Sequence, residues 1–189
     1  MKYIFDFDDT LFNTVKFKER IFFCIEKAGI SRTTAEEHYE KTRKTKKPFS
    51  LKKFLTELGV ENLYEEIMSE CPNLLNTELV KALQRLNKKD RYVVTNGHDE
   101  FQRDKIRRSG IEHLFPDIST TTGSKKEQVT RICDMDKKET VVFFDDKEEF
   151  FKDLKDCKNL FPILYKNEAF ADLMKRVGEN SGRELKGIK

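Results

Sequence analysis

Short apolar runs that alternate with helical patterns constrain the fold of this chain more than any other feature. The apolar runs, which are typical of buried strands, lie at residues 3–7, 91–95, 116–121, 140–144 and 160–165. The helical patterns lie at residues 77–86, 100–109, 124–133, 147–157 and 168–177. Strands that alternate with helices of about ten residues predict an α/β fold, a Rossmann-like three-layer core with a mostly parallel sheet.

Two local signals refine this prediction. Pro162 cannot donate a hydrogen bond to a neighbouring strand, so we expect the last run to form an edge strand. Ser124 is followed three residues later by Glu127, which predicts a capping box with Ser124 as the N-cap of the helix at 124–133.

Residues 14–76 interrupt the alternation, because their apolar residues recur at helical spacing and no strand pattern is present. We therefore expect a small α-helical insertion after the first strand, standing above the carboxyl ends of the sheet. The α/β core would then consist of residues 1–13 and 77–178. The tail at 179–189 is polar, and we expect it to be flexible.

The composition is that of one globular domain with one core. Apolar residues make up 37% and charged residues 38% of the 189 residues, and a net charge of +3 is too small to argue for nucleic acid. The four cysteines form no CxxC pair, so neither a zinc site nor a disulfide framework is indicated, and we expect a cytoplasmic setting. No stretch approaches the roughly 20 apolar residues that cross a bilayer, so no membrane partner is predicted.

Charged and polar residues collect where the predicted strands end. Asp6, Asp8 and Asp9 follow the first strand, and carboxylates so close together call for a bound cation. Further polar residues follow other strands or open a helix: Thr95, Asn96, Gly97, Asp145, Asp146, Lys125 and Lys126. In an open parallel sheet the ligand crevice lies outside the carboxyl ends of the strands. Carboxylates, a hydroxyl, an amide and a lysine at one edge are the groups that phosphoryl transfer requires.

Four of these segments carry a resemblance to a known family. In chain order they are DFDDTLF (residues 6–12), VVTNG (93–97), SKKEQV (124–129) and VVFFDD (141–146). This series resembles the four motifs of the haloacid dehalogenase (HAD) superfamily, in its phosphatase branch. The match covers residues 1–13 and about 80–165, and it implies that the helical insertion is a cap.

The resemblance implies a role for each residue. Asp6 would attack phosphorus and form an aspartyl-phosphate. Asp8 would protonate the leaving group and then activate water. Thr95 would donate to the phosphoryl oxygens, and Lys125 would balance the negative charge. Lys125 is preferred to Lys126 because Val129 then turns into the core one helical turn later.

The remaining candidates are substrate contacts and metal ligands. Thr10, Asn96, Gly97 and Lys126 are the further candidates for substrate binding, although Thr10 could instead support the turn that holds Asp6. The cofactor implied is Mg²⁺, which prefers few carboxylates and near-octahedral oxygen ligands. Its ligands would be Asp6, the backbone carbonyl of Asp8 and Asp146, with Asp145 binding directly or through water. At Asp9 the family often has glycine, so no direct role is expected for this residue.

The function predicted is Mg²⁺-dependent hydrolysis of a phosphate monoester, acting on a small phosphorylated metabolite or a nucleotide. One alternative is a phosphatase acting on nucleic-acid ends, which rests only on the basic stretch at 41–53. Another is a non-catalytic phosphate-binding module on the same fold, but such a module tends to lose the nucleophile or the acid/base. No residue pattern specifies an oligomeric state.

Overall fold

The computed structural model describes residues 1–45, 47–166 and 172–175. Its centre is a five-stranded sheet in the order β3-β2-β1-β4-β5, with every neighbouring pair parallel. The strands are β1 (Lys2–Phe5), β2 (Arg91–Asn96), β3 (Asp117–Thr121), β4 (Val141–Asp145) and β5 (Leu160–Leu164). The predicted α/β class and all five strand positions are confirmed. Pro162 lies in β5 at one edge of the sheet, where its missing N–H costs no pairing.

The register of the central strands explains why carboxylates from distant motifs meet. Phe5 pairs with Phe144, and their rings stack with centroids 5.0 Å apart. The next residue, Asp6, donates its backbone N–H to the carbonyl of Phe144 at 2.8 Å. The ends of β1 and β4 are therefore level, and Asp6 lies beside Asp145 at the carboxyl edge of the sheet.

Helices cover both faces of the sheet, which confirms the three-layer core. The helices after the first 76 residues are α5 (Thr77–Gln84), α6 (Asp99–Arg108) and α7 (Lys126–Asp134). Apolar side chains of α5 and α6 pack with Phe5 and Phe144 in one buried cluster. Those of α7 pack with Ile4 and Phe143 in a second cluster on the opposite face.

Two of the predicted helices differ in detail from the structure. Residues Glu148–Leu154 form a 3₁₀ helix and not an α-helix, as is common in a short connection between two elements. The helix α7 begins at Lys126 with Lys125 as its N-cap, and Ser124 accepts a hydrogen bond from the Lys126 N–H. The predicted capping box with Ser124 at the N-cap is therefore wrong. Of the helix predicted at 168–177, the structure describes residues 172–175, which are helical, and the tail at 179–189 lies outside the described residues.

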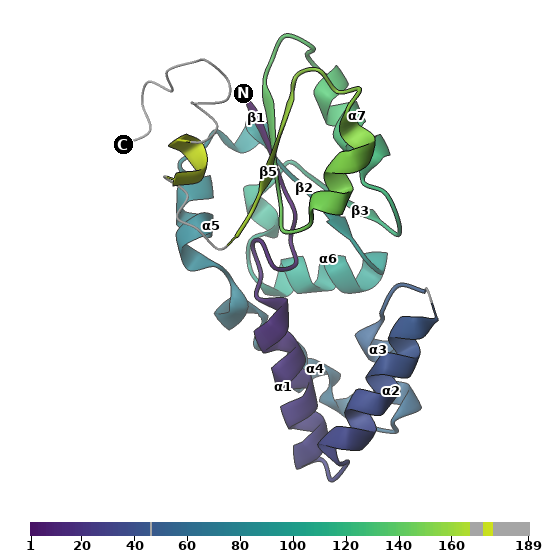
Figure 1. Cartoon of the computed structure of the whole chain (residues 1–189). Coiled ribbons are helices and arrows are strands. Elements are labelled where there is room, and N and C mark those ends of the chain that lie inside the picture. Colours follow the sequence, from purple (N-terminus) through teal and green to yellow (C-terminus); the bar gives the residue numbers. More distant parts are fainter. Residues whose placement is uncertain (46, 167–171, 176–189) are drawn as a thin grey trace.

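The described part of residues 14–76 is helical and contains no strand of the sheet. Its helices are α1 (Thr14–Lys27), α2 (Arg32–Lys44), α3 (Leu51–Glu57) and α4 (Tyr64–Met68). Short 3₁₀ helices lie within this segment at Glu61–Leu63 and Cys71–Leu74, and later in the chain at Lys88–Asp90 and Glu112–Leu114. Figure 1 places α1 to α4 together beyond the carboxyl ends of the strands. No helix among the described residues is long and apolar enough to cross a membrane.

Candidate active site

A buried lysine lies between two carboxylates at the carboxyl edge of the sheet. Lys125 Nζ donates to Asp6 Oδ1 and to Asp145 Oδ2, at 2.6 Å in each case. All three side chains are almost completely buried. Burial opposes the charge on Lys125, but the two carboxylates outweigh it and raise its pKa, so the ammonium form persists. One cation thus holds two carboxylates from two different strands.

The carboxyl group of Asp6 has an unusual protonation equilibrium. Burial raises the pKa of Asp6 to about 7, with Asp145 and Asp8 acting in the same direction and Lys125 opposing them. A cation bound beside Asp6 would favour its charged form.

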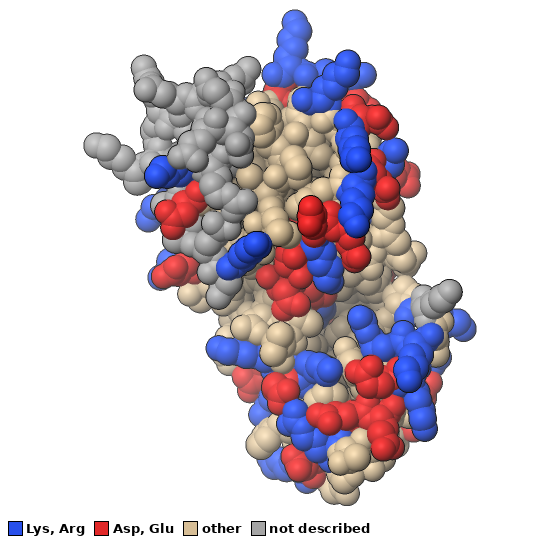
Figure 2. Space-filling model, viewed as in Figure 1, with Lys and Arg blue, Asp and Glu red and all other residues tan. Residues whose placement is uncertain are grey.

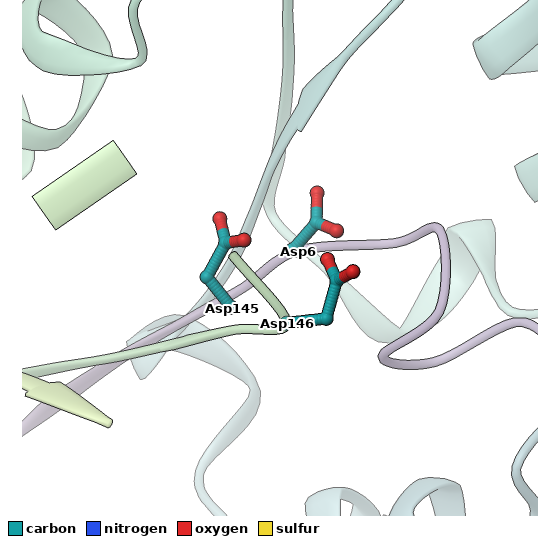
Figure 3. A group of neighbouring side chains, drawn as sticks. All are labelled: Asp6, Asp145 and Asp146. Carbon is teal, nitrogen blue, oxygen red and sulfur yellow. The ribbon is translucent and has the colours of Figure 1, made fainter. Parts of the chain in front are cut away.

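A third carboxylate, Asp146, completes an acidic group with Asp6 and Asp145. One carboxylate oxygen from each residue lies within 4.8 Å of the others (Figure 3). Asp146 Oδ1 is buried and has no hydrogen-bond partner among the described residues. Burial and the nearby Asp145 raise the pKa of Asp146, although Lys147 opposes them. Both oxygens of Asp145, in contrast, already accept hydrogen bonds, from Lys125 and from the backbone N–H of Lys147.

Asp8 lies two residues after Asp6 and is held by three side chains. Its Oδ1 accepts from Lys105 Nζ at 2.5 Å and from Thr14 Oγ1 at 3.0 Å, and its Oδ2 accepts from Gln102 Nε2 at 2.8 Å. Burial opposes the charge on Asp8, but Lys105, Gln102 and Thr14 outweigh it and lower the pKa of the carboxyl. Asp6 and Asp8 therefore have pKa values that the protein moves in opposite directions.

Lys105 and Gln102 are site residues that the sequence reasoning missed. Lys105 is 2% exposed, and its Nζ lies 5.0–5.3 Å from the ring centroids of Phe7, Phe12 and Phe101. It sits one helical turn after Phe101 on the buried face of α6. A lysine on the apolar face of a predicted helix could have indicated this contact, because a buried lysine needs a carboxylate partner.

Gly97 makes room for Gln102. Its φ is +152°, and a Cβ built there would come within 2.4 Å of Gln102 Nε2. Any larger residue at 97 would displace the amide that donates to Asp8. The Gly97 N–H itself donates to the carbonyl of Thr121 at 2.7 Å, so it is engaged and not free for a substrate.

The other predicted substrate contacts occupy different places. Thr95 is fully buried and its Oγ1 has no partner among the described residues. Asn96 lines the same cavity as Asp6, but its Nδ2 donates to the carbonyl of Gly123 at 2.5 Å. Thr10 lines a separate cavity, and Lys126 is half-exposed with its Nζ 3.7 Å from Asp156. The structure thus brings Lys125 to the carboxylates and leaves Lys126 outside.

The turn after Asp8 shows why glycine suits position 9 in related motifs. Asp9 has a φ of +56°, a left-handed conformation that glycine adopts without strain and that aspartate tolerates. Its Oδ1 accepts from the Thr14 N–H at 3.1 Å, and Asn13 caps α1 by accepting from the Lys16 N–H at 2.9 Å. These contacts fix the turn that leads from the site into α1.

These carboxylates open onto a cavity of about 380 Å³ between the sheet edge and the helical segment. We call Asp6, Asp8 and Lys125, which line one end of it, the charged floor. Five aromatic side chains also line the cavity, and we call them the aromatic wall: Phe17, Tyr39, Phe49, Phe101 and Phe150. In Figure 2 acidic side chains gather beside the narrowing between the two parts, and basic ones lie over the carboxyl end of α2.

Comparisons with known proteins agree with this geometry. A family model described as haloacid dehalogenase-like hydrolase matches residues 3–149. A haloacid dehalogenase-like hydrolase of Burkholderia xenovorans LB400 has a similar structure, with a TM-score of 0.65, 18% identity, and coverage of 85% of this chain and 79% of that one. No curated protein matches the chain.

Two further solved structures have different names and a similar fold. An L-2-haloacid dehalogenase of Xanthobacter autotrophicus has a TM-score of 0.57 at 12% identity, covering 93% of this chain and 81% of that one. A protein named as a β-phosphoglucomutase of Thermotoga maritima has a TM-score of 0.55 at 18% identity, covering 92% and 91%. At such identities the similarity concerns the fold, which these reactions share.

Proposed function

The chain belongs to the haloacid dehalogenase-like hydrolases, and within this family we propose that it is a Mg²⁺-dependent phosphate monoester hydrolase. The observation that supports this most is the charged floor: Lys125 holds Asp6 at one end of the cavity, Asp8 lines the same end, and Asp6 belongs to an acidic group with Asp145 and Asp146. A carboxylate held in place by a lysine can attack phosphorus, and a second carboxyl group two residues away can exchange a proton with the leaving oxygen. We assign Asp6 as the nucleophile and Asp8 as the acid/base.

The acidic group supports a divalent cation. Lys125 supplies one positive charge to three carboxylates, so a phosphate dianion could not approach without further positive charge. The unpartnered, buried Oδ1 of Asp146 fits a metal ligand. Asp6, Asp146 and the backbone carbonyl of Asp8 would hold Mg²⁺ directly, whereas Asp145 holds Lys125. When bound, the ion neutralises charge on the phosphoryl oxygens.

The chain's own residues account for both halves of the reaction. Asp6 attacks phosphorus and the bond from phosphorus to the ester oxygen breaks. Asp8 acts in its protonated form, which its lowered pKa makes the minor form of the free protein, and gives its proton to the leaving oxygen. Water then attacks the aspartyl-phosphate, Asp8 takes its proton, and inorganic phosphate leaves with Asp6 restored. Lys125 keeps Asp6 in place throughout. We assign Thr95, whose buried hydroxyl has no partner among the described residues, as a donor to a phosphoryl oxygen.

We further propose that residues 14–76 act as a cap on the α/β core of residues 1–13 and 77–178. Phe17, Lys18 and Tyr39 of this segment line the cavity that contains Asp6. A lid over such a site excludes water from the aspartyl-phosphate until the leaving group has departed.

A dehalogenase is the rival that shares this fold. Replacing a halide requires a carboxylate nucleophile but no proton for the leaving group and no cation. A dehalogenase would then use neither Asp8, which three side chains hold in place, nor the acidic group around Asp146. These features favour phosphate esters.

The test is a paired assay with the same protein. We expect phosphate release from p-nitrophenyl phosphate with Mg²⁺, none with excess chelator, and no halide release from 2-chloropropionate. Asp6→Asn should abolish phosphate release, whereas Asp156→Asn, on an exposed side chain, should leave it unchanged. Halide release, or phosphate release by folded Asp6→Asn protein, would contradict the proposal.

A further inference from the structure

We propose that the substrate is a phosphate monoester whose leaving group carries a planar ring, of about the size of a mononucleotide, and that the aromatic wall binds this ring. This inference rests on the proposed function, because the charged floor must hold the phosphoryl group. The argument depends on the side chains opposite that floor.

The aromatic wall is continuous from the helical segment to the core. The ring of Phe49 lies 5.2 Å from that of Tyr39 and 5.9 Å from that of Phe101, centroid to centroid. Phe101 in turn lies 6.2 Å from Phe17. On the other side of the cavity, Lys125 Nζ lies 4.3 Å from the ring centroid of Phe150. A ligand with its phosphoryl group at Asp6 would therefore extend between aromatic faces.

Packing alone does not account for this wall. Phe17 and Phe101 are buried, but Tyr39, Phe49 and Phe150 are only partly buried and face the cavity. Aromatic side chains that are left partly exposed beside a charged site offer stacking surface to a planar group. Base–aromatic stacking is a common use of such faces.

Two basic side chains stand at the same wall. Lys18 Nζ lies 4.5 Å from the ring centroid of Tyr39, and Arg43 lines the cavity from the end of α2. Within the described part of the chain neither forms an ion pair with a carboxylate. Both are therefore free to attract an anionic ligand and to pair with a ring that is stacked there.

The volume limits the size of this ligand. Ligand pockets range from about 300 to 1,000 Å³, and about 380 Å³ is near the lower end. One phosphate, one sugar and one ring system would fill such a space. A nucleic-acid strand would not be enclosed, so the cavity favours a single nucleotide or another ring-bearing monophosphate.

The experiment compares phosphate monoesters that carry a planar ring with one that does not. We would measure kcat/KM for the four nucleoside 5′-monophosphates, for pyridoxal 5′-phosphate and for ribose 5-phosphate, which has the sugar and phosphate but no base. We expect at least one ring-bearing substrate to exceed ribose 5-phosphate by about tenfold or more, since one stacked ring contributes on the order of a factor of ten. Comparison of the nucleotides with pyridoxal 5′-phosphate distinguishes a preference for a nucleobase from a preference for a pyridine ring.

Variants connect the preference to the wall. Phe49→Leu should reduce kcat/KM for the preferred ring substrate about tenfold, mainly through KM, and should reduce it by a smaller factor for ribose 5-phosphate, so that the preference for the ring falls. Phe49→Tyr should restore the preference because it restores the ring. Phe23→Leu is the matched control, since Phe23 is 53% exposed on α1 and does not line the cavity.

The outcomes separate this inference from the proposed function. Equal rates with ring-bearing substrates and ribose 5-phosphate, or a preference that survives Phe49→Leu, would overturn the ring proposal and leave the phosphatase intact. Hydrolysis of glycerol 3-phosphate, which has no ring, without hydrolysis of any ring-bearing substrate in the panel would overturn it as well. Failure on every ester, p-nitrophenyl phosphate included, would instead overturn the proposed function.

Discussion

The charged floor and the aromatic wall line the same cavity, but different forces specify them. The floor consists of two carboxylates that follow β1 and a lysine at the start of α7, and each carboxylate needs a partner because unpaired charge is costly in a buried place. The wall consists of rings on helices and, at Phe49, on the connection between α2 and α3, where shape decides and several apolar residues would pack nearly as well. We infer that the floor determines the reaction and that the wall selects the substrate.

From this difference we predict that removing a charge from the floor causes a large loss of activity. Lys125→Met should lower kcat/KM about a thousandfold, because it removes the cation that holds Asp6 and balances transferred charge. It should also destabilise the metal-free protein by about 3–5 kcal/mol, since Asp6 and Asp145 lose their buried partner.

The adjacent lysine provides the control. Lys126→Met should change kcat/KM less than about twofold, as expected for an exposed side chain that contributes little. Steady-state kinetics and thermal melts of the two variants give both comparisons. Equal losses in the two variants would mean that the structure places the wrong lysine at the floor.

A second prediction concerns Lys105, which lies where the floor meets the wall. Lys105→Met keeps an apolar stem among Phe7, Phe12 and Phe101 but removes the charge next to Asp8. Because Lys105 lowers the pKa of Asp8, its removal should raise that pKa. The basic limb of the pH profile of kcat/KM should then move to higher pH. Separately, kcat should fall about tenfold because Asp8 loses a contact that positions it.

A leaving-group comparison adds a readout for Lys105→Met that a purely structural role would not change. The loss should be larger for an alkyl phosphate, which needs a proton on its leaving oxygen, than for p-nitrophenyl phosphate. An unchanged pH profile with equal losses for both esters would show that Lys105 only supports packing.

The third prediction uses the raised pKa of Asp6. Protons and Mg²⁺ compete for this carboxyl, whose pKa is about 7 without a metal. Lowering the pH below about 7 should therefore weaken Mg²⁺ binding by up to about tenfold per pH unit, and raising it above that value should have little effect. Calorimetric titration of Mg²⁺ at several pH values measures this slope. Asp6→Asn should bind Mg²⁺ more weakly, and its affinity should not change with pH near 7. A wild-type Mg²⁺ affinity that does not change with pH would contradict the assignment of Asp6 as a metal ligand.

The smallest expected effect lies at the outer end of the wall. Arg43→Gln should lower kcat/KM about threefold at low salt and less at high salt, because an exposed charge is screened. Lys44→Gln, one residue away and outside the cavity lining, should have no effect. Equal effects of the two changes would mean that Arg43 acts only as part of the basic stretch and not through its place in the cavity lining.

Much of the fold and of the floor could be predicted from the sequence. The five strands and their mostly parallel arrangement followed from apolar runs and their spacing, although the strand order did not. Asp6 and Asp145 lie together because parallel strands end at one edge, and the helix start at Lys125 meets them there. The choice of Lys125 over Lys126 followed from the helical position of Val129. Such residues are predictable because their position is tied to a strand end or a helix start.

The rest depended on tertiary packing that local patterns do not encode. The contacts of Gln102 and Lys105 with Asp8 arise from how α6 docks beside the first strand, and the space left by Gly97 matters only in that arrangement. Phe17 and Ile21 recur at helical spacing, which predicts a core face equally well. The placement of the helical segment decides which aromatic side chains face the cavity.

The most direct test of the central claim is to trap the covalent intermediate on Asp6. Wild-type protein mixed with Mg²⁺ and a ³²P-labelled monoester and quenched in acid during turnover should carry label that hydroxylamine releases, as expected for an acyl phosphate. Peptide mapping should locate that label at Asp6, and Asp6→Asn should carry none. Turnover with no labelled protein at any quench time, or label on another residue, would contradict the account.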